Sequence, residues 1–158
     1  MKDDQIIATL NELIAASKDG ERELQRAAED AQTPEFTHLF SDAEQANRAA
    51  SAALQDQVRF LGSTAQQDGS MRAAARRTWT SVMSMMSPRD DSAIVEACER
   101  GQGDVRGRYA EALELDLPAP IHSVVEWHHR AIVATHYRLL DLRNRSRDGA
   151  TRALRAND

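Results

Sequence analysis

The segment Glu96-Ala-Cys-Glu-Arg-Gly-Gln102 decides how the rest of the chain is interpreted. Apolar residues recur around it at helical spacing, yet Glu99 and Gln102 carry polar, metal-capable groups on the face that otherwise consists of core residues. A second such place is Lys18-Asp-Gly-Glu21, where Glu21 falls on an apolar stripe and Gly20 allows a neighbouring element to approach closely. The two segments together predict a helical protein with polar groups inside it.

The composition is that of one helical domain. The chain has 158 residues, enough for a sizeable core, and only 4% are aromatic, whereas alanine and charged residues are abundant. A net charge of −5 argues against a general nucleic-acid binder. The single cysteine, Cys98, excludes an intrachain disulfide and indicates a reducing compartment, and no signal peptide or membrane span is visible. We therefore expect a bacterial, cytoplasmic protein without nucleic-acid or membrane partners.

Four segments show the apolar spacing of amphipathic helices. The expected helices are about Asp3 to Ala31, Pro34 to Leu61, Asp91 to Leu117 and Pro118 to Arg145. Thr33 suits an N-cap with Pro34 in the first turn, and Gly62 suits the C-terminal end of the second helix. The connector between the first two helices is very short, so these helices should form an antiparallel hairpin.

Residues 63–91 form a long connection between the second and third helices. Its start is polar and loop-like, whereas about 70–86 is amphipathic and predicts a helix roughly 25 Å long. Two helical hairpins joined by a long crossover are the ferritin-like arrangement. We therefore expect residues 1–145 to form an all-α, ferritin-like four-helix bundle with an additional crossover helix. Residues 146–158 are expected to be a basic tail that frays.

In that topology the second and third helices start at the same end of the bundle. Counting about 1.5 Å per residue from that end brings polar side chains of all four helices to one middle layer, within roughly one turn. These residues are Glu21, Glu44, Glu99, Gln102 and His136. Carboxylates and an imidazole in a bundle core can bind a pair of divalent metals such as Fe or Mn. The ligand set is incomplete, because Val133 rather than a glutamate precedes His136 by one turn.

The same residues also have structural interpretations. Glu21 can be a buried acid paired with Arg48, Glu99 can lie at the flank of its helix in water, and His136 can be a hydrogen-bonded core histidine. Two hypotheses follow. The first is a divalent-metal carboxylate protein with iron or oxygen chemistry. The second, favoured because the ligand set is incomplete, is a non-catalytic, stress-related binding or assembly module whose layer is a salt-bridge network.

No arrangement of nucleophile and base identifies an enzyme activity in this sequence. The alanine-rich and crossover surfaces offer places for a homodimer or a higher homo-oligomer. The sequence alone fixes neither the oligomeric state nor a protein partner.

Motifs in a fixed order resemble a bacterial family. They are Lys18-Asp-Gly-Glu21, the Trp79-containing crossover, Cys98-Glu-Arg-Gly101 and Tyr109-x-x-Ala-Leu113. Over about Asp3 to Leu142 the chain is similar to domain of unknown function 2383, a four-helix-bundle family classed as ferritin-like. The resemblance implies a fold and not a reaction. Members commonly carry Glu at the position of Gln102, so the resemblance also implies weaker metal binding here, because an amide is a poorer ligand than a carboxylate.

Overall fold

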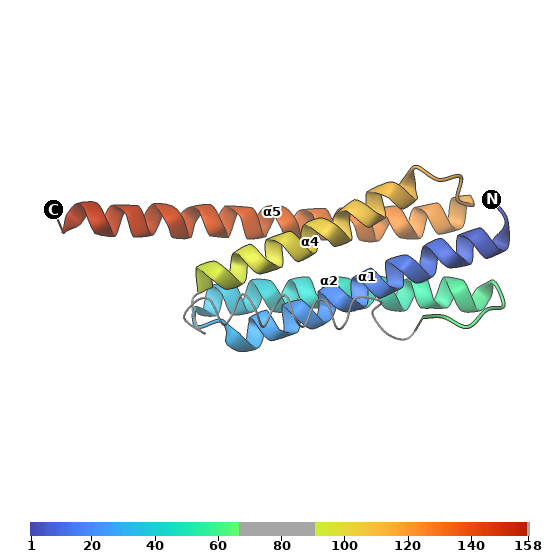
Figure 1. Ribbon diagram of the computed structural model, residues 1–158, viewed down its shortest axis with the longest axis horizontal. Helices are drawn as coiled ribbons and strands as arrows, with labels where there is room; N and C mark the ends of the chain where they lie inside the picture. The colour runs from blue at the N-terminus through green and yellow to red at the C-terminus, as the bar shows by residue number, and fades with distance from the viewer. Residues whose placement is uncertain (67–90, 158) are drawn as a thin grey trace.

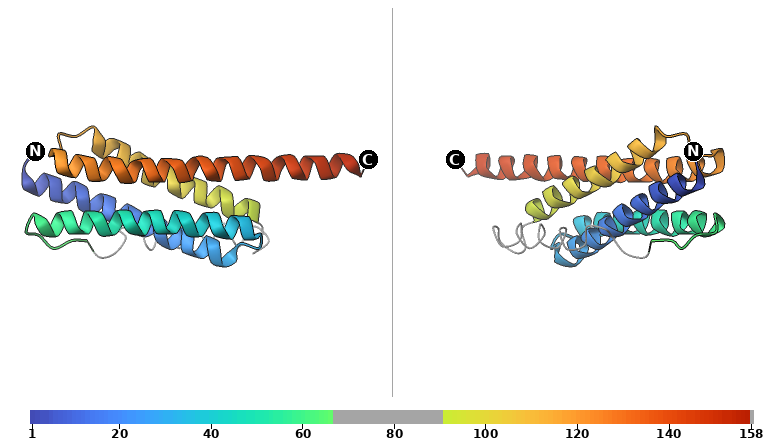
Figure 2. Two further views of the ribbon diagram at one scale, coloured as in Figure 1. Left: turned by 180° about the vertical axis from the view of Figure 1, so that it is seen from behind. Right: turned by 45° about the vertical axis from the view of Figure 1, so that its right-hand side comes forward.

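The computed structural model describes residues 1–66 and 91–157, without the side chains of residues 146, 150 and 151. These ranges contain the helices α1 (Asp3–Asp30), α2 (Pro34–Phe60), α4 (Asp91–Leu113) and α5 (Ala119–Ala156), and no strand. The helices form an elongated bundle (Figure 1; Figure 2). The expected crossover helix over about 70–86 lies outside the described residues. Within those ranges, no helix is long and apolar enough to cross a membrane.

The helices follow the order α1, α2, α5, α4 around the bundle, so α2 lies diagonally opposite α4. Asp91, the first residue of α4, accepts hydrogen bonds from the backbone N–H groups of Gln32 and Thr33 in the α1–α2 turn, both at 3.0 Å. Helices α2 and α4 therefore start at the same end of the bundle (Figure 1). This confirms the predicted all-α bundle of two antiparallel hairpins with the ferritin-like crossover topology.

Both ends of α2 follow from its own sequence. Thr33 is the N-cap residue and Pro34 is the first helical residue, a position that lacks an intrahelical N–H partner in any case. At the other end Gly62 has a φ of 78°. The N–H groups of Gly62 and of the next residue donate to the carbonyls of Arg59 and Val58, at 2.9 and 3.2 Å. This is a Schellman end, which glycine permits because it adopts positive φ freely.

The last two helices differ in length from the prediction. Helix α5 continues to Ala156, past the predicted end near Arg145, and its last turns project beyond the other helices (Figure 1). Gly149 does not end the helix, because arginine, alanine and leucine on either side of it have high helix propensity. Helix α4 ends at Leu113, short of the predicted Leu117.

The core has two apolar halves, one around Leu10 and Leu54 and the other around Leu24 and Phe40. Between the halves lies a layer of polar side chains that are at most 7% exposed and come from all four described helices. Its members are Ser17, Asn47, Ser51, Gln102, Thr135 and His136. The polar break that the sequence predicts in the middle of the bundle is therefore present.

Asp91→Ala should lower the free energy of unfolding by about 1–2 kcal/mol, because it removes the acceptor for two backbone N–H groups of the α1–α2 turn. Urea denaturation measures this change. The control is Asp42→Ala, which removes an ion pair between two largely exposed side chains, Asp42 and Arg138, and should cost less than about 0.5 kcal/mol. Equal losses of unfolding free energy in the two variants would contradict the conclusion that Asp91 stabilises the α1–α2 turn.

Candidate functional site

At the centre of the polar layer, two amides on diagonally opposite helices form a hydrogen bond. Asn47 Nδ2 on α2 donates to Gln102 Oε1 on α4 at 3.0 Å, and also to the backbone carbonyl of Ala43 at 3.0 Å. Both amide side chains are 1% exposed. Because an unpaired buried amide is costly, this bond favours one alignment of α2 with α4 across the bundle.

Gly20 on α1 makes room for the amide pair. A Cβ at this position would lie 2.7 Å from Asn47 Oδ1 and 3.1 Å from Gln102 Nε2. Neither of these two atoms has a hydrogen-bond partner in the part of the chain that the structure describes. They lie against the Gly20 backbone, so α1, α2 and α4 meet at this point. The close approach that the sequence predicts for Gly20 is therefore confirmed.

A second buried hydrogen bond joins α1 to α4. The hydroxyl groups of Ser17 and Tyr109 are 2.7 Å apart, and both side chains are fully buried. Burial raises the pKa of the Tyr109 phenol well above its ordinary value. The phenol therefore stays protonated, and the pair serves as an interhelical bond.

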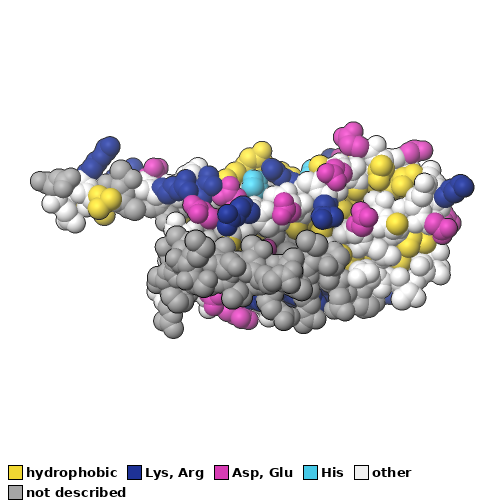
Figure 3. All heavy atoms as spheres, in the orientation of Figure 1, with side chains coloured by type: hydrophobic (Ala, Val, Ile, Leu, Met, Phe, Trp, Pro, Cys, Tyr) yellow, Lys and Arg dark blue, Asp and Glu magenta, His cyan; other side chains and the backbone are white. Residues whose placement is uncertain are grey.

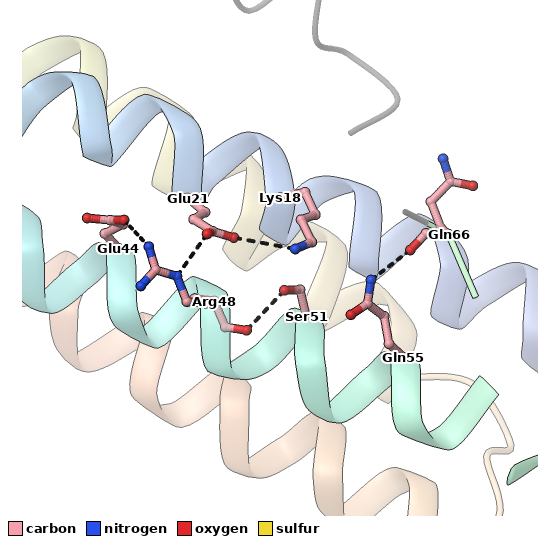
Figure 4. A network of polar contacts seen from close by, with 7 residues as sticks. All are labelled: Lys18, Glu21, Glu44, Arg48, Ser51, Gln55 and Gln66. Carbon is pink, nitrogen blue, oxygen red and sulfur yellow. Dashed lines mark hydrogen bonds and ion pairs between the residues drawn. The ribbon is translucent and has the colours of Figure 1, made fainter. Parts of the chain in front are cut away.

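Glu21 and Glu44 lie outside this centre, between α1 and α2 (Figure 4). Arg48 Nε donates to Glu21 at 3.0 Å, Arg48 Nη2 donates to Glu44, and Lys18 Nζ lies 3.8 Å from Glu21. The two carboxylate side chains are 15% and 14% exposed, whereas Arg48 is 56% exposed. One guanidinium thus holds two of the expected metal ligands. The ion pair with Arg48, which the sequence offers as the alternative for Glu21, is present.

Glu99 lies between α4 and α5, where Arg143 donates a hydrogen bond to its carboxylate. His136, two turns before Arg143 on α5, is 7% exposed, and its Nδ1 has no hydrogen-bond partner among the described residues. Desolvation lowers the pKa of His136. Arg106 lowers this pKa further, and Glu99 opposes the change. His136 is therefore neutral at neutral pH.

The five predicted site residues fall into three groups: Glu21 with Glu44, Gln102 at the centre, and Glu99 with His136. In the ranges 1–66 and 91–157, no three His, Cys, Asp or Glu side chains lie close enough together to hold a metal ion. Each candidate carboxylate has an arginine partner, so the donors as arranged do not fit a pair of divalent metals. Metal binding at this layer stays a prediction from the sequence.

Sequence reasoning missed Glu23, a partly buried acid beside the layer. The Glu23 carboxylate on α1 occupies the space that a side chain at position 101 of α4 would fill. Desolvation, together with the nearby carboxylates of Asp104 and Asp19, raises the pKa of Glu23 from 4.5 to about 7, with Arg100 acting in the opposite direction. The available signal was Gly101 itself, since glycine inside a helix often marks the close approach of another group.

Residues 5–115 match the family model described as Domain of unknown function (DUF2383). The chain belongs to this family. Among solved structures, a point mutant of Dps1 from Mycobacterium smegmatis has the same fold, with a TM-score of 0.72 and 12% sequence identity over 88% of this chain and 95% of that chain. At this identity the likeness shows the fold alone. No protein of curated function matches the chain.

Gly20→Ala should destabilise this DUF2383 protein by about 2 kcal/mol, because the new methyl group would push Asn47 away from Gln102. Gly103→Ala is the matched control, since nothing lies within 4 Å of a Cβ at that position of α4. It should stabilise the protein by up to about 1 kcal/mol through helix propensity. Chemical denaturation of the two variants gives both values. Equal stability of the two would exclude a tight contact at Gly20.

Glu23→Gln should change how stability depends on pH. The folded-state pKa of Glu23, about 7, lies above its ordinary value of 4.5, so the folded state binds more protons between these values. The stability that protonated Glu23 contributes is fully present below pH 4.5 and is lost as the pH rises through about 7. Glutamine does not ionise, so the variant does not lose this stability. The free energy of unfolding of Glu23→Gln relative to the wild type should therefore be about 2 kcal/mol larger at pH 8 than at pH 5, a figure reduced for solvent screening.

Urea denaturation at the two pH values measures this gain. Glu29→Gln, at an exposed position of α1, is the matched control and should show no comparable change. A pH-independent difference between Glu23→Gln and the wild type would contradict the placement of Glu23 against Gly101.

Proposed function

We propose that this chain is a non-catalytic binding or assembly module on a ferritin-like bundle, and that its middle polar layer is structural. The observation that supports this proposal is the pairing of every candidate carboxylate ligand with arginine. Arg48 binds Glu21 and Glu44, and Arg143 binds Glu99. Bacterial origin, a cytoplasmic location, a role in stress and self-association belong to the same proposal as predictions from the sequence.

The physical reason is competition between the guanidinium groups and a metal ion. To bind a metal, the carboxylates would have to give up charge-assisted hydrogen bonds, which are the stronger kind. The released guanidinium would then remain close to a divalent cation, and the two positive charges repel each other. Gln102 adds only a neutral amide, and that amide already accepts from Asn47. The network is therefore better suited to fixing helix alignment than to coordinating metal.

His136 is the observation that favours a second candidate, a divalent-metal carboxylate protein of the di-iron or di-manganese type. A neutral imidazole is a competent metal ligand, and Nδ1 of His136 is buried without a hydrogen-bond partner in the described part of the chain. In this candidate Glu99 would exchange Arg143 for the metal. The rearrangement would have to be driven by the metal itself.

Metal analysis together with thermal melting tests the choice. Protein expressed in medium supplemented with iron and manganese, and purified without chelator, should contain no stoichiometric metal. Its Tm should not change when Fe²⁺, Mn²⁺ or Zn²⁺ is added, because a ligand that binds the folded state would raise it. About two metal ions per chain, lost in Glu99→Ala, would overturn the proposal in favour of the metal protein.

Glu99→Gln tests the structural role directly. It should destabilise the protein by about 2 kcal/mol with or without added metal, because Arg143 loses its charged partner. A comparison is Glu126→Gln, which affects an ion pair with Arg130 on the exposed side of α5 and should cost less than about 0.5 kcal/mol.

A further inference from the structure

The C-terminal end of α5 and the α4–α5 corner carry opposite charges. From residue 143 onward the chain has five arginines and two aspartates, a formal charge of +3, so the first 142 residues carry −8 of the total of −5. The last part of this basic end projects beyond the bundle (Figure 3). The α4–α5 corner exposes Glu111, Glu114 and Asp116. Helix α5 has 38 residues and is about 57 Å long, so the two charged regions lie at opposite ends of the molecule (Figure 1).

Neither region is neutralised within the described ranges. The first three arginines of the basic end pair with glutamates of the bundle, but Arg152 and Arg155 form no ion pair with a described residue. The same holds for the three acids of the corner. Leu154, between the two arginines, is 71% exposed, and Leu115, among the acids, is 42% exposed. Each region therefore presents exposed charges without a partner among the described residues, and the signs are opposite.

The outer side of α5 also exposes two large aromatic residues. Trp127 is 71% exposed and Tyr137 is 61% exposed, and the small, exposed Ala134 lies between them. Exposed tryptophan and tyrosine are typical anchors of protein interfaces. The last turns of α5 project beyond the other described helices and their described side chains are exposed, so this surface is open to a second copy (Figure 1).

We propose that two copies of this chain form a two-fold dimer in which their α5 helices pack antiparallel through these outer faces. In such an isologous interface each contact occurs twice. A two-fold axis near Ala134 places Trp127 of one copy beside Tyr137 of the other. Within about one helical turn, the same axis brings the Arg152–Arg155 end of each copy to the α4–α5 corner of the other.

This arrangement accounts for all of these observations. Arg152 and Arg155 lie 25 and 28 residues after Trp127, which places them on the same outer side of α5. In the dimer they meet Glu114 and Asp116 of the second copy. Such charge complementarity gives an interface its specificity and orientation. A single chain cannot make these contacts, because its own corner lies at the far end of α5. The inference rests on the proposed assembly role, but it uses a surface separate from the polar layer.

The test is the mass of the full chain in solution, by sedimentation velocity and light scattering. The wild type should have twice the chain mass of 17.6 kDa. The pair Arg152→Glu with Arg155→Glu, and the pair Glu114→Arg with Asp116→Arg, should each weaken self-association at least tenfold. An equimolar mixture of the two proteins should restore the dimer, because both contacts again join opposite charges. Arg152→Lys with Arg155→Lys, which keeps the charge, should remain dimeric.

A second readout follows burial of the aromatic pair. In a Trp79→Phe background Trp127 is the only tryptophan, and its fluorescence should shift to the blue as protein concentration rises through the dissociation constant. Far-UV circular dichroism shows that each variant is folded. A monomeric wild type up to about 100 µM, or a mixture that stays monomeric, would overturn the inference, and open polymers would overturn the two-fold arrangement. Stoichiometric metal would overturn only the proposed role of the layer.

Discussion

The contact of Gly20 with Asn47 and Gln102 is the constraint on which the bundle depends. The two amides bond to each other across the diagonal, and α1 approaches them closely because position 20 has no side chain. Leaving a buried amide unpaired costs about 1–3 kcal/mol, so shifted helix alignments are disfavoured. The apolar halves of the core on either side contribute burial energy, which is insensitive to small shifts along the helices. The polar contact therefore selects one alignment of the helices.

Charged groups lie farther from this centre than neutral polar groups, because a charge loses more solvation energy when it is buried. Neutral groups such as the amides and the Ser17–Tyr109 pair occupy the fully buried positions, and the carboxylates lie at the flanks of the layer with arginines that reach solvent. Moving a charge into the core is far more costly than burying a hydrogen-bonded amide. Glu23 also lies at the flank of the bundle, where Gly101 leaves space for it, and its pKa of about 7 leaves it about half protonated at neutral pH.

Much of the fold could be predicted from the sequence, because periodicity, Thr33-Pro34 and Gly62 are local signals. The arrangement of the site could not. Counting residues along helices locates a level to about one turn, or 5.4 Å, whereas shared metal coordination requires distances of about 2.0–2.6 Å. The five predicted site residues therefore lie at about the same level of the bundle, although the structure separates them into three groups. The partnership of Arg143 with Glu99 depends on how α5 packs against α4, which no spacing within one helix reveals.

A double-mutant cycle between Asn47 and Gln102 tests the central claim most directly. The free energies of unfolding of Asn47→Ala, Gln102→Ala and the double variant would be measured by urea denaturation beside the wild type. If the amides depend on each other, each single variant leaves its partner buried and unpaired, so the double variant should lose about 1–2 kcal/mol less than the sum of the two. Simple additivity would mean that the amide pair does not hold α2 to α4, and would contradict the account.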